Sequence, residues 1–139
     1  MIGKSFNARQ YSMKPRAALQ LTGKLGFNTD AIAQMGITPD SGIVLAPEMN
    51  DKEIYYAKVV TPCTEDAFPV KRSGDYFYIN TKLLFDERDL DYTHITYIFD
   101  IARCEKYDNE IDGVCYKLKG RHKPRTQAAD QDELEEQAE

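Results

Sequence analysis

Apolar and polar residues alternate over several short stretches of the chain, the pattern expected of strands with one buried face. The first stretch places Leu19, Leu21, Leu25 and Phe27 on odd positions around a Thr-Gly-Lys turn at 22–24. This spacing predicts a hairpin or two closely linked strands. The apolar runs at 43–45 and 54–60 predict two further strands, which are joined by a polar turn at 48–52.

A short helix is expected between these two pairs of strands. Thr29 offers a side-chain oxygen as N-cap, Asp30 falls in the first turn, and Gly36 is placed as a C-terminal stop. The helix would span residues 30–35, about two turns. A strong turn signal, Thr-Pro-Asp-Ser-Gly at 38–42, follows it.

The same order of features occurs again after residue 67, which predicts an internal duplication with a period of about fifty residues. The matched pairs are Gly23 with Gly74, Leu25 with Tyr76, Phe27 with Tyr78, Thr29 with Thr81, Ile32 with Leu84, and Ile37 with Leu90. We therefore predict a mainly β protein of the β-rich α+β class. Two diverged β-β-α-β-β units would pack as a small barrel or sandwich.

This interpretation divides the chain into four parts. Residues 1–16 are a flexible basic arm, 17–61 the first unit, and 67–118 the second unit with an extra C-terminal strand over 111–118. Residues 119–139 hold few apolar side chains, too few to offset the entropy of ordering them. They are expected to form a disordered tail, first basic and then acidic.

Charge follows the same division. The net charge is −5, yet residues 1–24 carry five Lys and Arg and no acid, and residues 117–125 carry five more cations. Acids prevail in the middle segment and form the charged residues of the last fourteen positions. A polyanion would therefore meet the basic flanks. The predicted contact residues are Lys14, Arg16, Lys24, Lys71, Arg72, Lys117, Lys119, Arg121, Lys123 and Arg125.

Nine tyrosines and six phenylalanines supply ring side chains, several of them adjacent in expected strands. Neighbouring strand residues point to opposite faces, so some rings must face outward. We select Tyr76, Tyr78 and Tyr55 as candidates for stacking on unpaired bases or for anchoring a protein interface. Packing in strands is a third explanation for the same residues.

Catalytic and metal-binding patterns are not evident in the sequence. Neither histidine, His94 or His122, has a partner in a known nucleophilic arrangement, and the three cysteines lack metal-ligand spacing. The acidic run 86–91 lacks the glycine and spacing of a calcium loop. We therefore expect no enzyme activity, no metal and no cofactor.

The N-terminal 24 residues contain no apolar run long enough for a signal peptide or membrane span, because four basic residues interrupt them. Reduced thiols fit the odd number of cysteines. We expect a cytoplasmic protein without membrane contact, in the host cell cytoplasm if a phage encodes it.

The stretch 19–45, LQLTGKLGFNTDAIAQMGITPDSGIVL, resembles the swapped-hairpin repeat of AbrB-type transcription regulators, and two copies in one chain resemble their MraZ branch. The family has proline where this chain has Asn28 and Asn80. The resemblance implies a homodimeric DNA-binding regulator in which Lys24 faces DNA with support from Lys14 and Arg16. Lys71 and Arg72 would be the counterparts in the second unit.

The acidic C-terminus is similar to the tails of many single-strand-binding proteins, which implies competition between the tail and nucleic acid for the basic groups. Three hypotheses follow. The protein is an AbrB-like binder of duplex DNA, a single-strand binder modulated by its tail, or an assembly or inhibitor protein of a phage or mobile element without a nucleic-acid ligand. We favour the nucleic-acid class, with DNA before RNA and a further protein partner for the tail.

Overall fold

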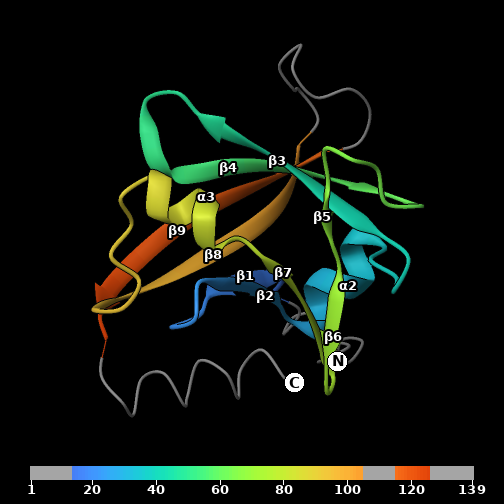
Figure 1. Ribbon diagram of the computed structural model, residues 1–139, viewed down its shortest axis with the longest axis horizontal. Helices are drawn as coiled ribbons and strands as arrows, with labels where there is room; N and C mark the ends of the chain where they lie inside the picture. The colour runs from blue at the N-terminus through green and yellow to red at the C-terminus, as the bar shows by residue number, and fades with distance from the viewer. Residues whose placement is uncertain (1–13, 105–114, 126–139) are drawn as a thin grey trace, which may run out of the picture.

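The computed structural model describes residues 14–104 and 115–125 of the chain (Figure 1). The elements in chain order are β1 (Arg16–Leu19), β2 (Lys24–Phe27), α2 (Thr29–Met35), β3 (Gly42–Glu48), β4 (Asp51–Val60), β5 (Phe68–Pro69), β6 (Lys71–Ser73), β7 (Tyr76–Asn80), α3 (Lys82–Glu87), β8 (Ile95–Cys104) and β9 (Cys115–Pro124). The predicted mainly β fold class is confirmed. Of the described helices, none is long and apolar enough to cross a bilayer.

The strands form one antiparallel sheet in the order β5-β3-β4-β9-β8-β1-β2-β7-β6. Its two edges are joined by one short segment. β5 pairs with β3, the Val70 amide donates to the Ser41 carbonyl over 3.1 Å, and β6 pairs with β7. Residues 68–73 therefore touch both edges, and the sheet curls into a nearly closed barrel, which leaves little free edge for aggregation.

The two halves of the chain pair in a matching way. The first strand of the chain, β1, pairs with β8, and the 68–73 segment that opens the second half pairs with β3. The second strands of the two halves, β2 and β7, pair with each other, as do the final strands β4 and β9. Each half thus extends its leading hairpin into the sheet of the other half.

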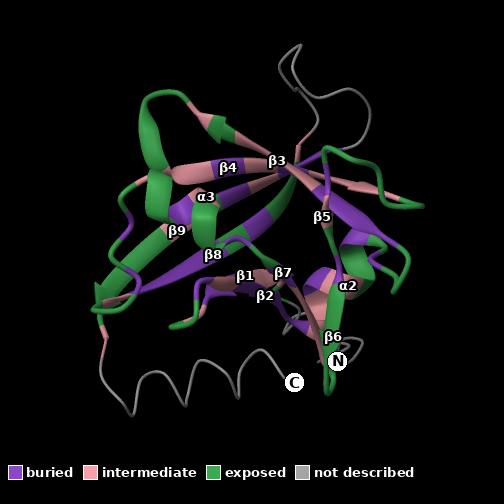
Figure 2. Cartoon of the chain, viewed as in Figure 1, coloured by how far each residue is buried: buried purple, intermediate pink, exposed green. Residues whose placement is uncertain are grey.

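The barrel interior holds a cluster of aromatic and aliphatic side chains. Tyr55 makes edge-on contacts with Phe85 and Phe99, whose ring centroids lie 5.4 and 5.8 Å from its own. Phe85 comes from α3, while Ala31 and Met35 extend from α2 into the same core. Buried residues lie along the strands and exposed ones at the turns and over much of α3 (Figure 2). Each large buried side chain contributes roughly 1.5–3 kcal/mol.

The cap of α2 differs from the prediction. Its N-cap is Asn28, whose Oδ1 accepts from the Ala31 amide at 2.8 Å, while Thr29 is the first residue of the helix. The same oxygen accepts from the Arg16 amide, and Nδ2 donates to the Lys14 carbonyl. Asn28 is selected because it joins the helix to the start of β1 as well as capping it. Gly36 ends the helix at φ 70°, as expected of a left-handed cap.

The predicted boundary of the C-terminal tail is wrong. β9 continues to Pro124 and pairs with β8 along that length, from Cys104 opposite Cys115 to Ile95 opposite Pro124. This pairing satisfies the backbone of residues 119–124 while their charged side chains stay in solvent. Residues 1–13 of the predicted arm (1–16), the first residues of the expected strand at 111–118, and the acidic end at 126–139 lie outside the described residues. The last residue of the predicted arm, Arg16, is the first residue of β1.

Candidate nucleic-acid interface

Four basic residues occupy alternate positions along β9, and all four point away from the barrel interior. They are Lys117, Lys119, Arg121 and Lys123. The intervening Leu118 is fully buried, which fixes the opposite side of the strand as the core side. Neighbours in this basic stripe lie about 6.6–6.8 Å apart along the strand. A row of cations with this regular spacing suits the repeating phosphates of an extended nucleic-acid strand.

The outer face continues from β9 around half of the barrel. One cross-strand row consists of Arg121, Ile98, Ala18, Gly26, Tyr78 and Lys71. The centre of the row has small side chains, with basic residues at both ends. Ala18 and Gly26 at its centre are buried, whereas the cations at its two ends are exposed.

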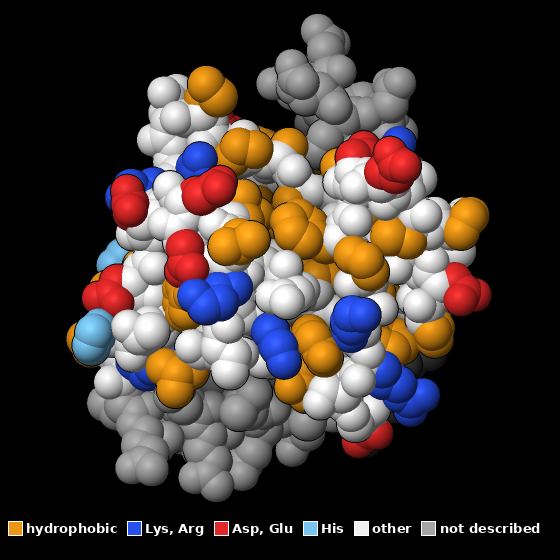
Figure 3. All heavy atoms as spheres, viewed as in Figure 1, with side chains coloured by type: hydrophobic (Ala, Val, Ile, Leu, Met, Phe, Trp, Pro, Cys, Tyr) orange, Lys and Arg blue, Asp and Glu red, His pale blue; other side chains and the backbone are white. Residues whose placement is uncertain are grey.

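Positive charge predominates on these strands. β1, β2, β6, β7, β8 and β9 together hold nine Lys and Arg residues and one acid, Asp100. Two of the nine, Arg72 and Arg103, lie on the other side of their strands. Asp100 is paired with Arg121 at 2.9 Å and with Arg16 at 3.6 Å. In the view of Figure 3, Lys and Arg gather over β2, β6 and β7. In the described part of the chain, the acidic residues other than Asp100 lie on other elements or in loops, which leaves this face attractive to a polyanion.

The predicted residues of the two hairpins lie at the far end of this face. The Lys24 ammonium lies 4.8 Å from the centroid of the Tyr78 ring, a cation–π contact across β2 and β7. Lys71 is exposed opposite Tyr78, and Arg72 donates from Nε to the Gly74 carbonyl at 3.0 Å. The Tyr76 hydroxyl accepts a hydrogen bond from the Gln20 amide at 3.2 Å.

The structure gives three other predicted residues different surroundings. Tyr55 is wrong as an exposed platform, because it is 1% exposed and its hydroxyl accepts from Arg88 at 3.0 Å. Burial raises the pKa of its hydroxyl. Arg125 lies beyond the strand and donates to the carbonyls of Tyr92 and Leu19, so it joins chain segments. Lys14 is exposed, and its amide donates to Asp30.

A second polar cluster lies on α3 and the loop after it. Lys82 donates to Asp86 at 2.7 Å, and the Tyr92 hydroxyl donates to the same carboxylate. The Asp86 bond raises the pKa of Lys82 and of Tyr92, and the Lys82 bond lowers the pKa of Asp86. Each shift favours the protonation state already present at neutral pH, so these hydrogen bonds tie α3 to the loop after it.

His122 lies on the opposite side of β9 from the basic stripe. Its Nδ1 is 2.7 Å from the Glu53 carboxylate, and its ring is near Tyr97. Within the described ranges, no three His, Cys, Asp or Glu side chains come together in a way that suits a metal ion.

Sequence reasoning identified the residues of the stripe but not their arrangement. Basic residues alternate with Leu118, Gly120 and His122, and this alternation continues beyond residue 118. It was a signal that the predicted strand should extend further toward the C-terminus. Thr96, a buried residue beside the stripe, gave no signal in the sequence, because its importance depends on which strand lies next to it.

Comparison with known proteins assigns this chain to no family. No family model matches the chain, and neither the curated proteins nor the solved structures contain a match, so its function has to be inferred from its own residues.

Proposed function

We propose that this chain is a non-enzymatic nucleic-acid-binding accessory or regulatory protein that holds a sugar-phosphate backbone along β9. The observation that carries the proposal is the basic stripe of Lys117, Lys119, Arg121 and Lys123 on the outer face of one strand. Cations in a straight, regular row neutralise successive phosphates without reading sequence. The protein would therefore bind with broad sequence tolerance and a strong dependence on salt.

A single strand is the ligand that this geometry favours. The outer face is the convex side of a small barrel, and the stripe follows one strand of it. Half-buried Tyr76 and Tyr78 face the same side and offer rings near Lys24 and Lys71. Outward rings beside cations are suited to stacking of unpaired bases.

Duplex binding by an AbrB-like regulator is the second candidate. The exchange of leading hairpins between the two halves, with β1 on β8 and 68–73 on β3, supports it. The resemblance implies a homodimer, whereas one chain supplies both halves of the barrel here. We retain a homodimer and a cytoplasmic location as parts of the proposal. The three free cysteines are compatible with a reducing compartment.

Fluorescence anisotropy of labelled single-stranded and duplex oligonucleotides over a salt series tests the proposal. Arg121→Gln is expected to weaken binding and to reduce the slope of log K against log salt by about 0.7 for a single strand or about 0.9 for a duplex. Arg103→Gln is the matched control, because Arg103 is exposed on the other side of β8. It should leave the slope unchanged.

The same assay examines the acidic end of the chain. Deletion of residues 127–139 is expected to raise affinity at low salt, because the carboxylates of this segment compete with phosphates for the cations. If neither strand form binds at low ionic strength with or without these residues, the nucleic-acid proposal is wrong. The better description would then be an assembly or inhibitor protein of a phage or mobile element that binds other proteins.

A further inference from the structure

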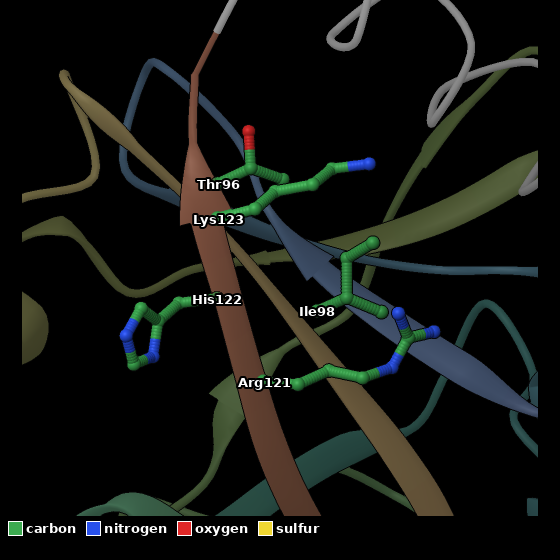
Figure 4. A pocket seen from close by; sticks show the side chains of 5 residues that line it. All are labelled: Thr96, Ile98, Arg121, His122 and Lys123. Carbon is green, nitrogen blue, oxygen red and sulfur yellow. The ribbon is translucent and has the colours of Figure 1, made fainter.

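A small pocket lies on the outer face between β8 and β9, inside the proposed interface. It has a volume of about 110 Å³ and is lined by Thr96, Ile98, Arg121, His122 and Lys123. Figure 4 shows Arg121 and Lys123 extending over β8 on one side of β9, while His122 points to the other side. Sites for drug-sized ligands usually measure about 300–1,000 Å³. This pocket therefore suits a small group and is too small for a nucleoside.

Thr96 is the unusual member of the lining. The residue is 3% exposed, and its hydroxyl oxygen has no hydrogen-bond partner in the described part of the chain. Leaving a buried polar group unsatisfied costs about 1–3 kcal/mol. A valine at this position would fill the same space without that cost. The hydroxyl therefore suits a ligand that accepts a hydrogen bond from it.

The cations beside Thr96 define the chemistry of that ligand. Lys123 is directly opposite Thr96 in the β8–β9 register, and Arg121 is opposite Ile98, the next outward residue. Arg121 uses its Nε to bind Asp100, which fixes the guanidinium while its terminal amino groups remain as donors. The apolar floor formed by Ile98, itself 4% exposed, strengthens electrostatic attraction to the cations.

We propose that Thr96, Arg121 and Lys123 form an oxyanion subsite that takes one phosphate of a bound nucleic-acid strand. All three residues line one small pocket, and a tetrahedral oxyanion in it has several acceptor oxygens to receive one neutral and two charged donors. This inference rests on the proposed function and deepens it. Most of the stripe attracts phosphates by charge alone, whereas this subsite holds one of them by a directed hydrogen bond and sets the register of the strand.

The substitution Thr96→Val in the full chain tests the subsite. It removes the hydroxyl and keeps the shape, so the midpoint of thermal unfolding should stay the same or rise. Oligonucleotide affinity is expected to fall about tenfold, the scale of one hydrogen bond to a charged group. The salt slope should not change, because no charge is lost. Thr96→Ser, which retains the hydroxyl, should keep most of the affinity.

Thr93→Val is the matched control, since Thr93 lies outside the pocket and its hydroxyl is bonded to Asp91. It should bind as the unmodified chain does. If Thr96→Val also binds with unchanged affinity while Arg121→Gln weakens binding, the subsite is refuted and the proposed function stands.

A titration with inorganic phosphate separates the two proposals when no oligonucleotide binds. Amide NMR shifts at Thr96 and Arg121 that saturate with phosphate, and disappear in Thr96→Val, would support an oxyanion site that serves free phosphate. Absence of such shifts would overturn the subsite together with the proposed function.

Discussion

Arg121 on β9 and Asp100 on β8 form an ion pair across the outer face, with 2.9 Å between Nε and Oδ2. Both side chains are about half exposed, so the pair itself adds little to stability. Its importance is electrostatic, because Asp100 is the acid that the six strands of this face contribute. It offsets one unit of positive charge next to the proposed phosphate subsite.

Asp100→Asn is therefore expected to strengthen oligonucleotide binding severalfold at low salt and to make the salt slope steeper, since Arg16 and Arg121 lose their neutralising partner. Anisotropy over the salt series measures both quantities. Glu87→Gln, at the end of α3 and outside the face, changes the net charge equally and is the control. Equal effects of the two variants would mean that net charge, not the location of Asp100, governs binding.

Substitutions of Tyr55 and Tyr78 should have different effects on the free energy of unfolding and on oligonucleotide affinity. Tyr55→Ala removes a fully buried ring from contact with Phe85 and Phe99, and should lower the free energy of unfolding by about 3–5 kcal/mol. Tyr78→Ala removes a half-buried outward ring and its contact with Lys24, so it should cost far less stability.

Urea unfolding and anisotropy on the same samples check this pair. Tyr78→Ala is expected to weaken single-strand binding, by about 1–3 kcal/mol if a base stacks on the ring, and to affect duplex binding less. A Tyr78→Ala protein that binds both strand forms normally would remove the stacking role of this residue.

Gly120 is a packing constraint in the middle of the basic strand. A Cβ at this position would lie 2.7 Å from the Glu53 carbonyl oxygen and 3.1 Å from the Phe99 ring. Gly120→Ala must push β9 away from β4, at a cost of typically 1–3 kcal/mol. A Cβ at Gly74 would meet no neighbouring atom, so Gly74→Ala is disfavoured only by the left-handed backbone at φ 59°. This conformation should destabilise the variant by roughly 1–2 kcal/mol.

Chemical denaturation compares these two glycine variants, and nucleic-acid affinity distinguishes them further. Only Gly120→Ala should disturb the stripe on both sides of residue 120. If Gly120→Ala unfolds at the same urea concentration as the parent chain, the close approach of β9 to Glu53 does not constrain the fold.

Cys115 should make stability sensitive to alkaline pH. Burial and the neighbouring Cys104 thiol raise its pKa from 9.0 to about 11. Because the folded pKa is above the unfolded one, the neutral thiol contributes stability that is complete below pH 9 and is lost as pH rises through about 11. The free energy of unfolding of the parent chain should therefore fall relative to that of Cys115→Ala as the pH rises over this range.

Urea unfolding between pH 8 and pH 11 in the presence of a reductant tests this expectation. A difference that stays constant with pH would mean that the Cys115 thiol ionises as readily in the folded chain as in the unfolded one.

Local features of the fold could be predicted where the signal is local. The alternation of Leu19, Leu25 and Phe27 around a glycine turn predicted the β1–β2 hairpin, and Gly36 predicted the end of α2. The identity of the helix cap could not be predicted in this way. Asn28 and Thr29 are both good capping residues. Asn28 is the cap because the β1–β2 hairpin brings it next to Lys14 and Arg16, and its side chain forms hydrogen bonds with the backbone of both.

The candidate site was predicted as a set of residues and not as a surface. The sequence by itself determined that basic residues alternate between 117 and 123, because side-chain direction along a strand depends only on position parity. Only the tertiary structure decided that this side faces solvent and that Thr96, Arg121 and Lys123 share a pocket. The pairing of β9 with β8 and β4 decides it, since strands distant in sequence determine which side of β9 is buried.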